Sequence, residues 1–223
     1  MKQFQLEIFK GHPIIIEGEH RILIDTGAPS TIHRSGEIQF CGDDYDCTVN
    51  YMGLKISNIS ELLGMEITTL LGADILSEYK ILFDYANKAV TFSKENLNFV
   101  GKTLDITVFM GIPILQMSVN NQELKFFLDT GARLSFLSSD ITRNYKCVGT
   151  EEDFYPGVGP FQTDCFEVPT VFDGQLHLFK FGNLPDLLQM TLMLGGTHGI
   201  VGYDFFSQYQ VLLDIRNRKL TYA

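Results

Sequence analysis

The sequence predicts an all-β protein in which one structural unit is present twice. Two observations support this prediction. The chain of 223 residues contains many short apolar runs of strand length, separated by glycine and proline, and only short helical stretches. Several segments also recur in the same order along the chain, which indicates an internal repeat. A chain of this length can form one large domain or two small ones, and either can bury a hydrophobic core.

The clearest recurrence surrounds two aspartates, Asp25 and Asp129. Residues 22–28 have the sequence ILIDTGA, and residues 126–132 have the sequence FFLDTGA. In each copy an apolar run of strand length leads directly into Asp-Thr-Gly-Ala. The same local structure is therefore expected at both places, with each aspartate at the end of a strand.

A second recurrence lies near the end of each half of the chain. Residues 71–92 align with residues 201–222 without a gap over 22 positions, and eight of these positions are identical. A shorter Gly-x-Pro match joins residues 11–13 to residues 111–113. Three matches in the same order predict an ancient duplication. The expected units are residues 1–97 and 102–223, joined by the polar residues 93–102.

Apolar runs and the turn residues between them place the individual elements. We expect strands at residues 4–9, 13–16, 21–24, 80–83, 89–92, 210–213 and 220–222. We expect short helices at residues 60–63, 138–144 and 185–190. Other aspartates that recur in both halves are assigned to helix caps and turns rather than to chemistry: Asp74, Asp204, Asp84 and Asp214.

The composition is typical of a globular protein, with 45% hydrophobic and 20% charged residues. The net charge is −10 and the 17 Lys and Arg residues are scattered, so no nucleic-acid partner is expected. An acidic surface, and apolar runs that are all too short for a membrane span, disfavour membrane binding. The first residues lack the apolar region of a secretory signal, which predicts a cytoplasmic protein.

The cysteines and histidines form no pattern typical of a metal site. Cysteine pairs with C-x-x-C spacing and histidine pairs with H-x-x-x-H spacing are both absent, so we expect neither metal nor cofactor. Free thiols are the default in a cytoplasmic protein, with Cys41 and Cys47 the best pair if a disulfide forms. Ser30 and Ser135 lie near the aspartates, but the sequence indicates no histidine partner, and we assign both to turns.

Two Asp-Thr-Gly segments indicate a specific chemistry that one segment does not. A single copy is a common turn composition, because Asp bonds to its own backbone and Gly permits positive φ. Two related units packed about a pseudo-twofold axis would bring Asp25 and Asp129 together. Two close carboxyls cannot easily both ionise, so they share a proton and supply a general acid beside a general base. Such a pair can activate a water molecule without metal or cofactor.

The Asp-Thr-Gly-Ala segment, followed near the end of each unit by two apolar residues and glycine, resembles the pepsin and retropepsin clan of aspartic peptidases. The later motif is Leu-Leu-Gly at residues 70–72 and Ile-Val-Gly at residues 200–202. The resemblance covers nearly the whole chain, twice. It implies two pseudo-twofold-related retropepsin-like β-barrel lobes, residues 1–97 and 102–223. It also implies an aspartic endopeptidase that cleaves a peptide or protein substrate, with Asp25 and Asp129 as the catalytic pair.

The resemblance also assigns roles to the residues that follow each aspartate. It implies that Thr26 and Thr130 cross-link the two loops, and that Gly27 and Gly131 let the backbone approach the carboxyls. Ala28 and Ala132 occupy positions where retropepsins have alanine and pepsins have a hydroxyl residue. Retropepsins often carry an acidic residue next, and this chain has Pro29 and Arg133 there instead, which puts that substrate contact in doubt. Because both units lie in one chain, we expect a monomer.

The flap that covers the substrate in this clan is expected from the second unit. From Gly27 to Gly72 is 45 residues, whereas from Gly131 to Gly202 is 71 residues. The longer interval contains aromatic residues that flank a glycine-rich tip, which suits a mobile covering hairpin. The expected flap residues are Tyr155, Gly157, Gly159 and Phe161. Two alternatives remain: residues 153–161 are an ordinary surface loop, or the hairpin at residues 38–49, with Tyr45, is the flap.

Two other classes of function fit the same fold. The cleft could capture a peptide without turnover, or the chain could be a structural or assembly module. The intact aspartates, threonines and glycines of both segments favour catalysis. Tight binding of a statine-type transition-state mimic would distinguish an enzyme from a peptide-binding protein, and an assembly module would not bind the mimic at all.

Overall fold

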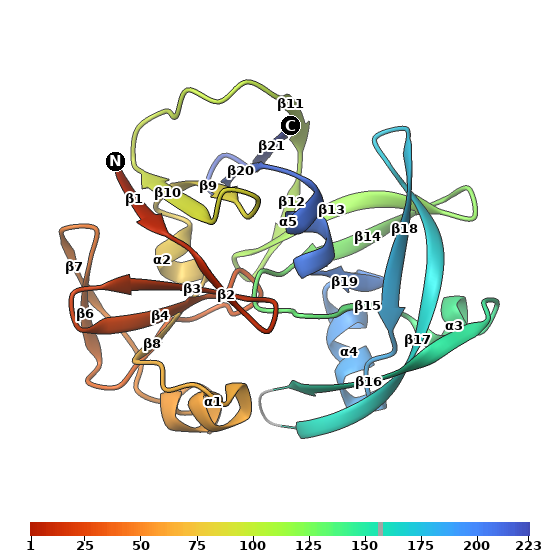
Figure 1. Ribbon diagram of the computed structural model, residues 1–223, viewed down its shortest axis with the longest axis horizontal. Coiled ribbons are helices and arrows are strands. Elements are labelled where there is room, and N and C mark those ends of the chain that lie inside the picture. The colour runs from red at the N-terminus through yellow and green to blue at the C-terminus, as the bar shows by residue number, and fades with distance from the viewer. Residues whose placement is uncertain (156–157) are drawn as a thin grey trace.

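The computed structural model describes residues 1–155 and 158–223, apart from the side chain of Leu187. The described chain is mostly β, with five short helices among twenty-one strands, which agrees with the predicted predominance of strands. Figure 1 shows the first half of the chain on one side and the second half on the other, with strands from both halves between them.

A five-stranded sheet is formed by the first half of the chain. Its strand order is β2-β3-β4-β8-β5, and β4 and β8 run parallel. Isoleucine and leucine dominate β4 and β8, and these side chains are almost completely buried. The strands are β2 (Glu7–Phe9), β3 (His12–Glu17), β4 (His20–Ile24), β8 (Thr69–Leu71) and β5 (Ile32–His33).

An eight-stranded sheet is formed by the second half. Its order begins β12-β13-β14-β19-β15, with β14 and β19 parallel, and continues with β18-β17-β16. The first five strands therefore follow the same order, with the same parallel pair, as the sheet of the first half. The strands are β12 (Thr107–Phe109), β13 (Ile112–Val119), β14 (Gln122–Leu128), β19 (Gly199–Val201), β15 (Ser135–Leu137), β18 (Gln175–Gly182), β17 (Gly159–Phe172) and β16 (Cys147–Tyr155).

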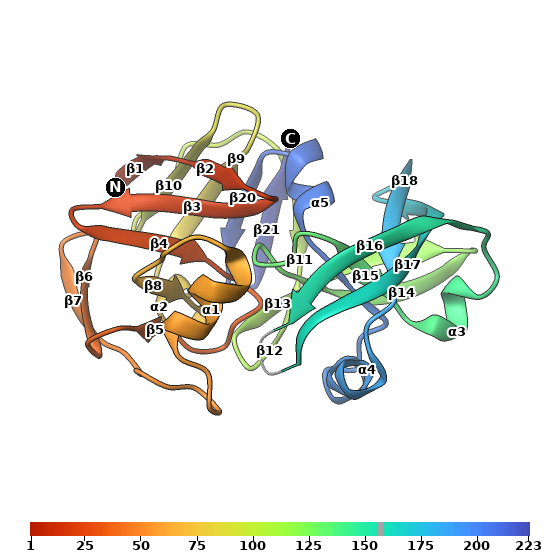
Figure 2. The same cartoon turned by 60° about the horizontal axis from the view of Figure 1, so that its bottom comes forward.

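A six-stranded sheet contains strands from both halves. Its order is β1-β10-β9-β20-β21-β11, and the antiparallel pair of β9 and β20 joins the two halves. The sheet lies between the halves in both views (Figures 1 and 2). The strands are β1 (Lys2–Gln5), β10 (Ala89–Ser93), β9 (Lys80–Asp84), β20 (Val211–Asp214), β21 (Lys219–Tyr222) and β11 (Lys102–Asp105).

The expected single strand at residues 4–9 is wrong in one respect. The chain leaves the six-stranded sheet after β1 and enters the five-stranded sheet with β2, and the buried Leu6 lies between them. Its N–H donates to the carbonyl oxygen of Lys88 at 2.8 Å. The second half makes the same transition at Ile106, whose N–H donates to Arg218 O at 3.0 Å. An apolar run does not reveal that the chain passes from one sheet to another, because the strands on both sides of the change are partly buried.

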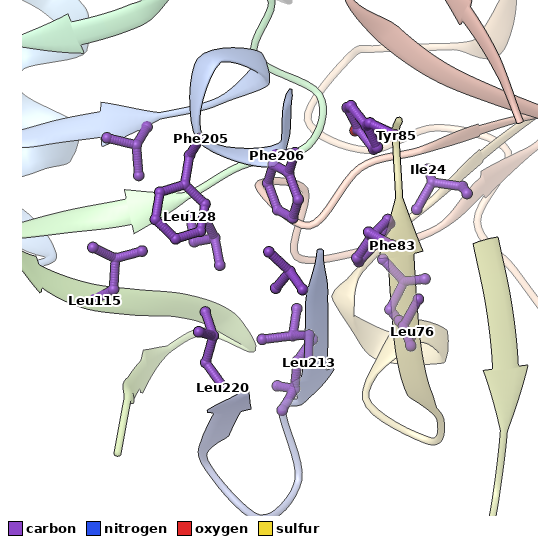
Figure 3. Packing of buried hydrophobic residues seen from close by; sticks show 14 of the residues in the cluster. Ile24, Leu76, Phe83, Tyr85, Leu115, Leu128, Phe205, Phe206, Leu213 and Leu220 are labelled. Carbon is purple, nitrogen blue, oxygen red and sulfur yellow. The ribbon is translucent and has the colours of Figure 1, made fainter. Parts of the chain in front are cut away.

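The main hydrophobic core extends across both halves (Figure 3). Phe83 of the first half packs edge-to-face on Phe206 of the second, with ring centroids 5.1 Å apart. Ile24 and Leu128, which precede the two aspartates, are fully buried in the same core. The strands that end at the aspartates are therefore fixed relative to one another by a shared interior.

The helices are short and partly as predicted. The expected helices at residues 60–63, 138–144 and 185–190 correspond to α1 (Ile56–Leu63), α3 (Ser139–Thr142) and α4 (Asp186–Leu194). α1 begins earlier than predicted, because the Asn58 side chain accepts the Lys55 N–H at 3.0 Å. Two further helices, α2 (Ala73–Leu76) and α5 (Tyr203–Gln208), were not predicted, since one or two turns carry little periodicity. No helix in the described part is long and apolar enough to cross a membrane.

Candidate active site

Two loops, residues 25–28 and 129–132, lie at the ends of β4 and β14. We call them the first and second Asp-Thr-Gly loops. The Asp25 N–H donates to Leu71 O at 3.0 Å, and the Asp129 N–H donates to Val201 O at 2.9 Å. Each aspartate is therefore held by the parallel strand beside its own, and the two apolar-apolar-Gly segments lie against the loops.

The two threonines connect the loops by four buried hydrogen bonds. The Thr26 N–H donates to Thr130 Oγ1 at 3.0 Å, and the Thr130 N–H donates to Thr26 Oγ1 at 2.9 Å. Each hydroxyl in turn donates to a carbonyl of the opposite half, Thr26 to Leu128 O at 2.7 Å and Thr130 to Ile24 O at 2.8 Å. Both threonines are fully buried. Because every buried donor here has a partner, the loops are held in a single relative position.

The glycines bring each loop against the aspartate of the other. A Cβ added at Gly27 would lie 2.2 Å from Asp129 Cγ, and one added at Gly131 would lie 2.5 Å from Asp25 Cγ. The Gly27 N–H donates to Asp25 Oδ1 at 2.9 Å, and the Gly131 N–H donates to Asp129 Oδ1 at 2.7 Å. Only glycine fits at these two positions without displacing a carboxyl group.

The two carboxyl groups interact directly and titrate together. Burial raises the pKa of Asp25 well above its ordinary value, and the neighbouring charge of Asp129 raises it further. Burial also raises the pKa of Asp129, although hydrogen bonds from Asp25 and Gly131 oppose the shift. Both side chains lie deep among protein atoms yet keep partial exposure, so a water molecule can reach them. The pair therefore retains one shared proton at pH values where separate carboxyls are ionised.

Hydroxyl groups behind the loops hold the segments that carry the two later glycines. The Gly72 N–H donates to Thr31 Oγ1 at 2.9 Å, and the Gly202 N–H donates to Ser135 Oγ at 3.2 Å. Ser135 thus has the turn-supporting role expected for it. In the first half, Thr31 rather than Ser30 has that role.

The recurring aspartates have mixed outcomes. Asp74 and Asp204 lie in the first turns of α2 and α5, whose N-cap residues are Gly72 and Gly202. The Asp74 carboxylate accepts the helix N–H of Ile75 at 2.8 Å, and it also accepts the N–H and the hydroxyl of Thr31, at 2.9 and 2.6 Å, which fixes the chain after the first loop. Asp84 and Asp214 do accept turn N–H groups, from Asn87 at 3.0 Å and Asn217 at 3.1 Å.

A long hairpin formed by β16 and β17 approaches the aspartates. Burial raises the pKa of Tyr155 to about 12, and the charges of Asp129 and Asp25 contribute. The ring of the adjacent Phe154 lies 5.6 Å from that of His12, which bonds to Gly131, so this end of the hairpin lies close to the second loop. Tyr155 and Phe161 pack against the second half's hydrophobic cluster that contains Phe136. Of the expected flap glycines, Gly159 has φ 89° beside the tip, and Gly157 lies outside the described residues.

The end of β16 also reaches the first half of the chain. Phe154 packs against a first-half cluster that includes Ile59 and Leu63 of α1. Its ring also lies 5.6 Å from that of His12. In both views the end of β16 lies beside α1 (Figures 1 and 2). The long hairpin therefore extends from the second half to the first, beside His12 and the second loop.

A short hairpin, formed by β6 (Glu37–Phe40) and β7 (Asp43–Asp46), occupies the corresponding interval of the first half. Phe40 is fully buried and lies 5.0 Å from Phe92 in edge-to-face contact. The Tyr45 hydroxyl is 2.7 Å from that of Tyr79 and donates to Glu78 at 3.2 Å. The short hairpin lies at the far edge of the first half from β16 and β17 (Figure 1). Its placement disfavours the alternative that it covers the aspartates.

Two residues at the site were not assigned a role from the sequence. His12 is buried, and its Nδ1–H donates to Gly131 O at 2.9 Å, so a first-half turn supports the second loop. Burial lowers the pKa of His12 to about 4, which keeps the ring neutral. Arg133 contacts the long hairpin. The sequence did contain a signal for these two residues. His12 aligns with Ile112 and Arg133 aligns with Pro29, so the two copies of the repeat differ at positions beside an Asp-Thr-Gly loop.

Other candidate sites lie away from the aspartates. One cavity of about 540 Å³ is lined by residues of the short hairpin, and another of about 270 Å³ is lined by residues that include His20, Arg21 and Arg34. Among the described residues, no three or more potential ligands are grouped to hold a metal ion. All four cysteines are free in the described structure, with Cys41 and Cys47 unpaired.

Comparison with solved structures identifies retropepsin-like neighbours. A retropepsin-like aspartic protease from Rickettsia conorii is 16% identical with a TM-score of 0.37, and the match covers 56% of this chain and 95% of that one. The retroviral protease-like domain of Ddi1 from Leishmania major is 17% identical with a TM-score of 0.31, covering 50% of this chain and 94% of that one. No protein-family model and no curated protein matches the sequence. Similarity at these TM-scores carries no inference about activity, which has to come from the geometry of the loops.

Proposed function

We propose that this protein is an aspartic endopeptidase in which Asp25 and Asp129 form the catalytic pair. One observation carries the proposal: two Asp-Thr-Gly loops from different halves are cross-linked through Thr26 and Thr130, and each loop's glycine lies against the carboxyl group of the other loop. A structural turn needs neither the reciprocal bonds nor two like charges placed together. Burying two carboxyls is costly unless they share a proton, and that shared proton is what acid–base chemistry on a water molecule requires.

The reaction follows from the single shared proton. The ionised carboxyl takes a proton from a water molecule as the water oxygen attacks the scissile carbonyl carbon. The neutral carboxyl gives its proton to the carbonyl oxygen, forming a neutral tetrahedral diol. When the C–N bond breaks, the nitrogen takes a proton from one carboxyl and a diol hydroxyl returns one to the other. The pair ends singly protonated, and the products are an amine and a carboxylic acid.

We propose that the chain consists of two pseudo-twofold-related, retropepsin-like units, residues 1–97 and 102–223. Three features support a duplication. The five-stranded sheet of the first half has the same strand order as the first five strands of the second-half sheet, and the parallel pairs β4–β8 and β14–β19 correspond. In both halves the chain changes from one sheet to another at equivalent positions, Leu6 and Ile106. Each unit contributes one aspartate, so a single chain holds both halves of the active site and can act as a monomer.

The substrate proposed is an extended peptide that lies between the aspartates and the long hairpin. Main-chain hydrogen bonds to the hairpin would align such a peptide as an added strand. Tyr155 presents aromatic surface toward the carboxyl pair, and Phe161 lies opposite Asp153 on the neighbouring strand of the hairpin. Such surface suits apolar side chains near the scissile bond and excludes water.

Peptide-library cleavage across pH 3 to 8, with Asp25→Asn and Asp129→Asn as controls, tests the proposal. We expect cleavage by the wild-type protein in mildly acidic to near-neutral solution, because burial keeps the shared proton on the pair as pH rises. A statine-type mimic should bind far more tightly than the matching plain peptide. Peptide binding without cleavage at any pH would instead identify a peptide-binding protein, and binding of neither ligand would exclude both functions.

A further inference from the structure

Arg133 follows the second Asp-Thr-Gly loop and contacts three successive residues of the long hairpin. One terminal guanidinium nitrogen donates to Glu151 Oε2 at 3.1 Å, and the other donates to the carbonyl oxygen of Glu152. The Nε lies 4.0 Å from Asp153 Oδ1. A guanidinium presents its donors in a fixed planar fork, so contacts of this kind define orientation as well as distance. They join β16 to the loop that carries Asp129.

The contacted residues lie close to the part of the hairpin that faces the site. Tyr155 is two residues beyond Asp153 on the same strand, a distance of roughly 7 Å at the rise of a β-strand. Successive alternate residues of a strand point to the same face, so Asp153 and Tyr155 share the face that Arg133 approaches. The position of Tyr155, at the end of β16 near the second loop, is therefore set a short distance from the Arg133 contacts.

The acidic side chains at this junction are suited to a cation. Hydrogen bonds from Lys180 and Arg133 hold the pKa of Glu151 below its ordinary value, so Glu151 is ionised. Lys180 Nζ lies 2.5 Å from Glu151 Oε1, on the opposite side of that carboxylate from Arg133. The Asp153 side chain is only 5% exposed; burial raises its pKa, and the charge of Arg133, 4.0 Å away, opposes that shift. The arginine therefore favours the ionised form of a carboxyl group that burial would otherwise keep neutral.

The equivalent position in the first half cannot make this connection. Pro29 aligns with Arg133 and has no side-chain donor. The short hairpin is instead held by Glu17, which accepts the Cys41 N–H at 3.1 Å, far from the first loop. The connection between an Asp-Thr-Gly loop and a hairpin thus exists once in the described structure, on the side where the hairpin reaches the aspartates.

We propose that Arg133 is a positioning residue for catalysis, which holds the long hairpin closed over the carboxyl pair through Glu151, Glu152 and Asp153. The proposal rests on the function proposed above. Arg133 acts through Tyr155 and its neighbours rather than on the reacting atoms. Its removal should let the hairpin open more often while leaving the carboxyl pair intact.

The test compares three variants of the full chain. Arg133→Met keeps the stem and removes the donors, Arg133→Lys keeps the charge and removes the fork, and Lys180→Met removes the other cation on Glu151 without touching the loop. Peptide cleavage gives kcat and KM separately, and hydrogen exchange measures opening of residues 147–155 and 159–166. The pH dependence of cleavage reports the carboxyl pair itself.

We expect Arg133→Met to lower kcat/KM about tenfold, the effect of one charge-assisted contact, mainly through KM. Its pH profile should be unchanged, and amide exchange in the hairpin should accelerate by roughly the same factor. Arg133→Lys should recover part of the loss, and Lys180→Met should stay within about twofold of wild type, because the cation at the loop remains. Unchanged hairpin exchange in Arg133→Met, or an equal loss in Lys180→Met, would overturn the proposal.

Direct recognition of an acidic substrate residue by Arg133 is the competing explanation. Two peptides that differ only by a Glu→Gln exchange beside the cleavage site separate the two roles. A positioning role predicts the same loss for both peptides, whereas a loss confined to the acidic peptide refutes it. If the wild-type protein cleaves no peptide, the proposed endopeptidase fails, and hydrogen exchange in the variants still decides whether Arg133 holds the hairpin.

Discussion

The two hairpins β6–β7 and β16–β17 occupy the same interval of the repeat and have different surroundings. The short hairpin buries Ile38 and Phe40 in the core of the first half and bonds its Tyr45 to Tyr79. The long hairpin leaves its own half at the tip, where Phe154 packs on first-half residues. Two hairpins at equivalent positions of the same strand order therefore need not have the same role. The additional residues in the second half extend a hairpin toward the first half, which we propose covers the site, whereas the hairpin of the shorter interval packs into a core.

The two aspartates provide the strongest test of how far the halves are equivalent. If they share one proton, Asp25→Asn and Asp129→Asn should each lower kcat/KM by at least about 10³-fold, because an amide can neither accept the water proton nor donate an acid proton. Cleavage of the best library peptide measures this loss. Substantial turnover by either variant would show that the carboxyl pair is not the catalytic group.

The same two variants should remain folded and become more stable. Burial raises both carboxyl pKa values, so the folded state binds more protons than the unfolded state, and stability is lost as pH rises above the ordinary Asp pKa. A neutral amide avoids that loss at pH 7. Each kcal/mol gained should raise Tm by roughly 2–4 °C in a chain of this size. A lower Tm in both variants would contradict the assigned direction.

Alanine substitutions in the two hairpins should distinguish a hairpin that covers the carboxyl pair from one that packs in the core. Tyr155→Ala and Phe161→Ala should each lower kcat/KM by roughly 10- to 100-fold, because they remove surface that excludes water from the carboxyl pair. Tyr45→Ala should leave kcat/KM within about twofold of wild type and lower the free energy of unfolding by roughly 1–2 kcal/mol. A large kinetic loss from Tyr45→Ala, with none from the other two, would reverse the roles of the hairpins.

The reciprocal hydrogen bonds of Thr26 and Thr130 predict that the two threonines contribute equally to the free energy of unfolding. Thr26→Val and Thr130→Val each remove one hydroxyl and leave one buried N–H without its partner, at a cost of about 1–3 kcal/mol. Urea unfolding at pH 7 measures the change. Losses that differ by more than a factor of two would show that one loop relaxes where the other cannot.

His12 has no counterpart in the second half, where Ile112 aligns with it. We expect it to produce a smaller change in the free energy of unfolding than the threonines, and one that depends on pH. Its pKa is lowered from 6.5 to about 4 in the folded state, so the unfolded state binds more protons between these values and stability falls as the solution is acidified through that window. From pH 7 to 5.5 the loss should be about 1 kcal/mol. His12→Gln, which keeps an N–H donor, should lose that much less over the same interval. An identical pH dependence in the variant would contradict the buried neutral ring.

Local patterns in the sequence predicted the β-rich class, the strands near the two ends of the first half and at the end of the second, and the loops that carry Asp25 and Asp129. These features depend on residues that are neighbours in the chain, such as an apolar run that ends at Asp-Thr-Gly. The break between β1 and β2 at Leu6, and the role of Arg133, were not predicted. Both depend on partners distant in sequence, Lys88 for the first and Glu151 for the second. The placement of the short hairpin likewise depended on where its aromatic side chains found a core.

The pairing of β9 with β20 has a consequence for how this architecture tolerates change. The two halves meet there through main-chain hydrogen bonds, for which side-chain identity matters little. The segments that supply this seam, residues 71–92 and 201–222, are identical at only eight of 22 positions and still align. A backbone ladder also resists sliding, because slipping by one residue would turn every buried side chain of the strand outward. Side chains on the outer face of this sheet can therefore be replaced without changing the main-chain pairing that positions the two halves.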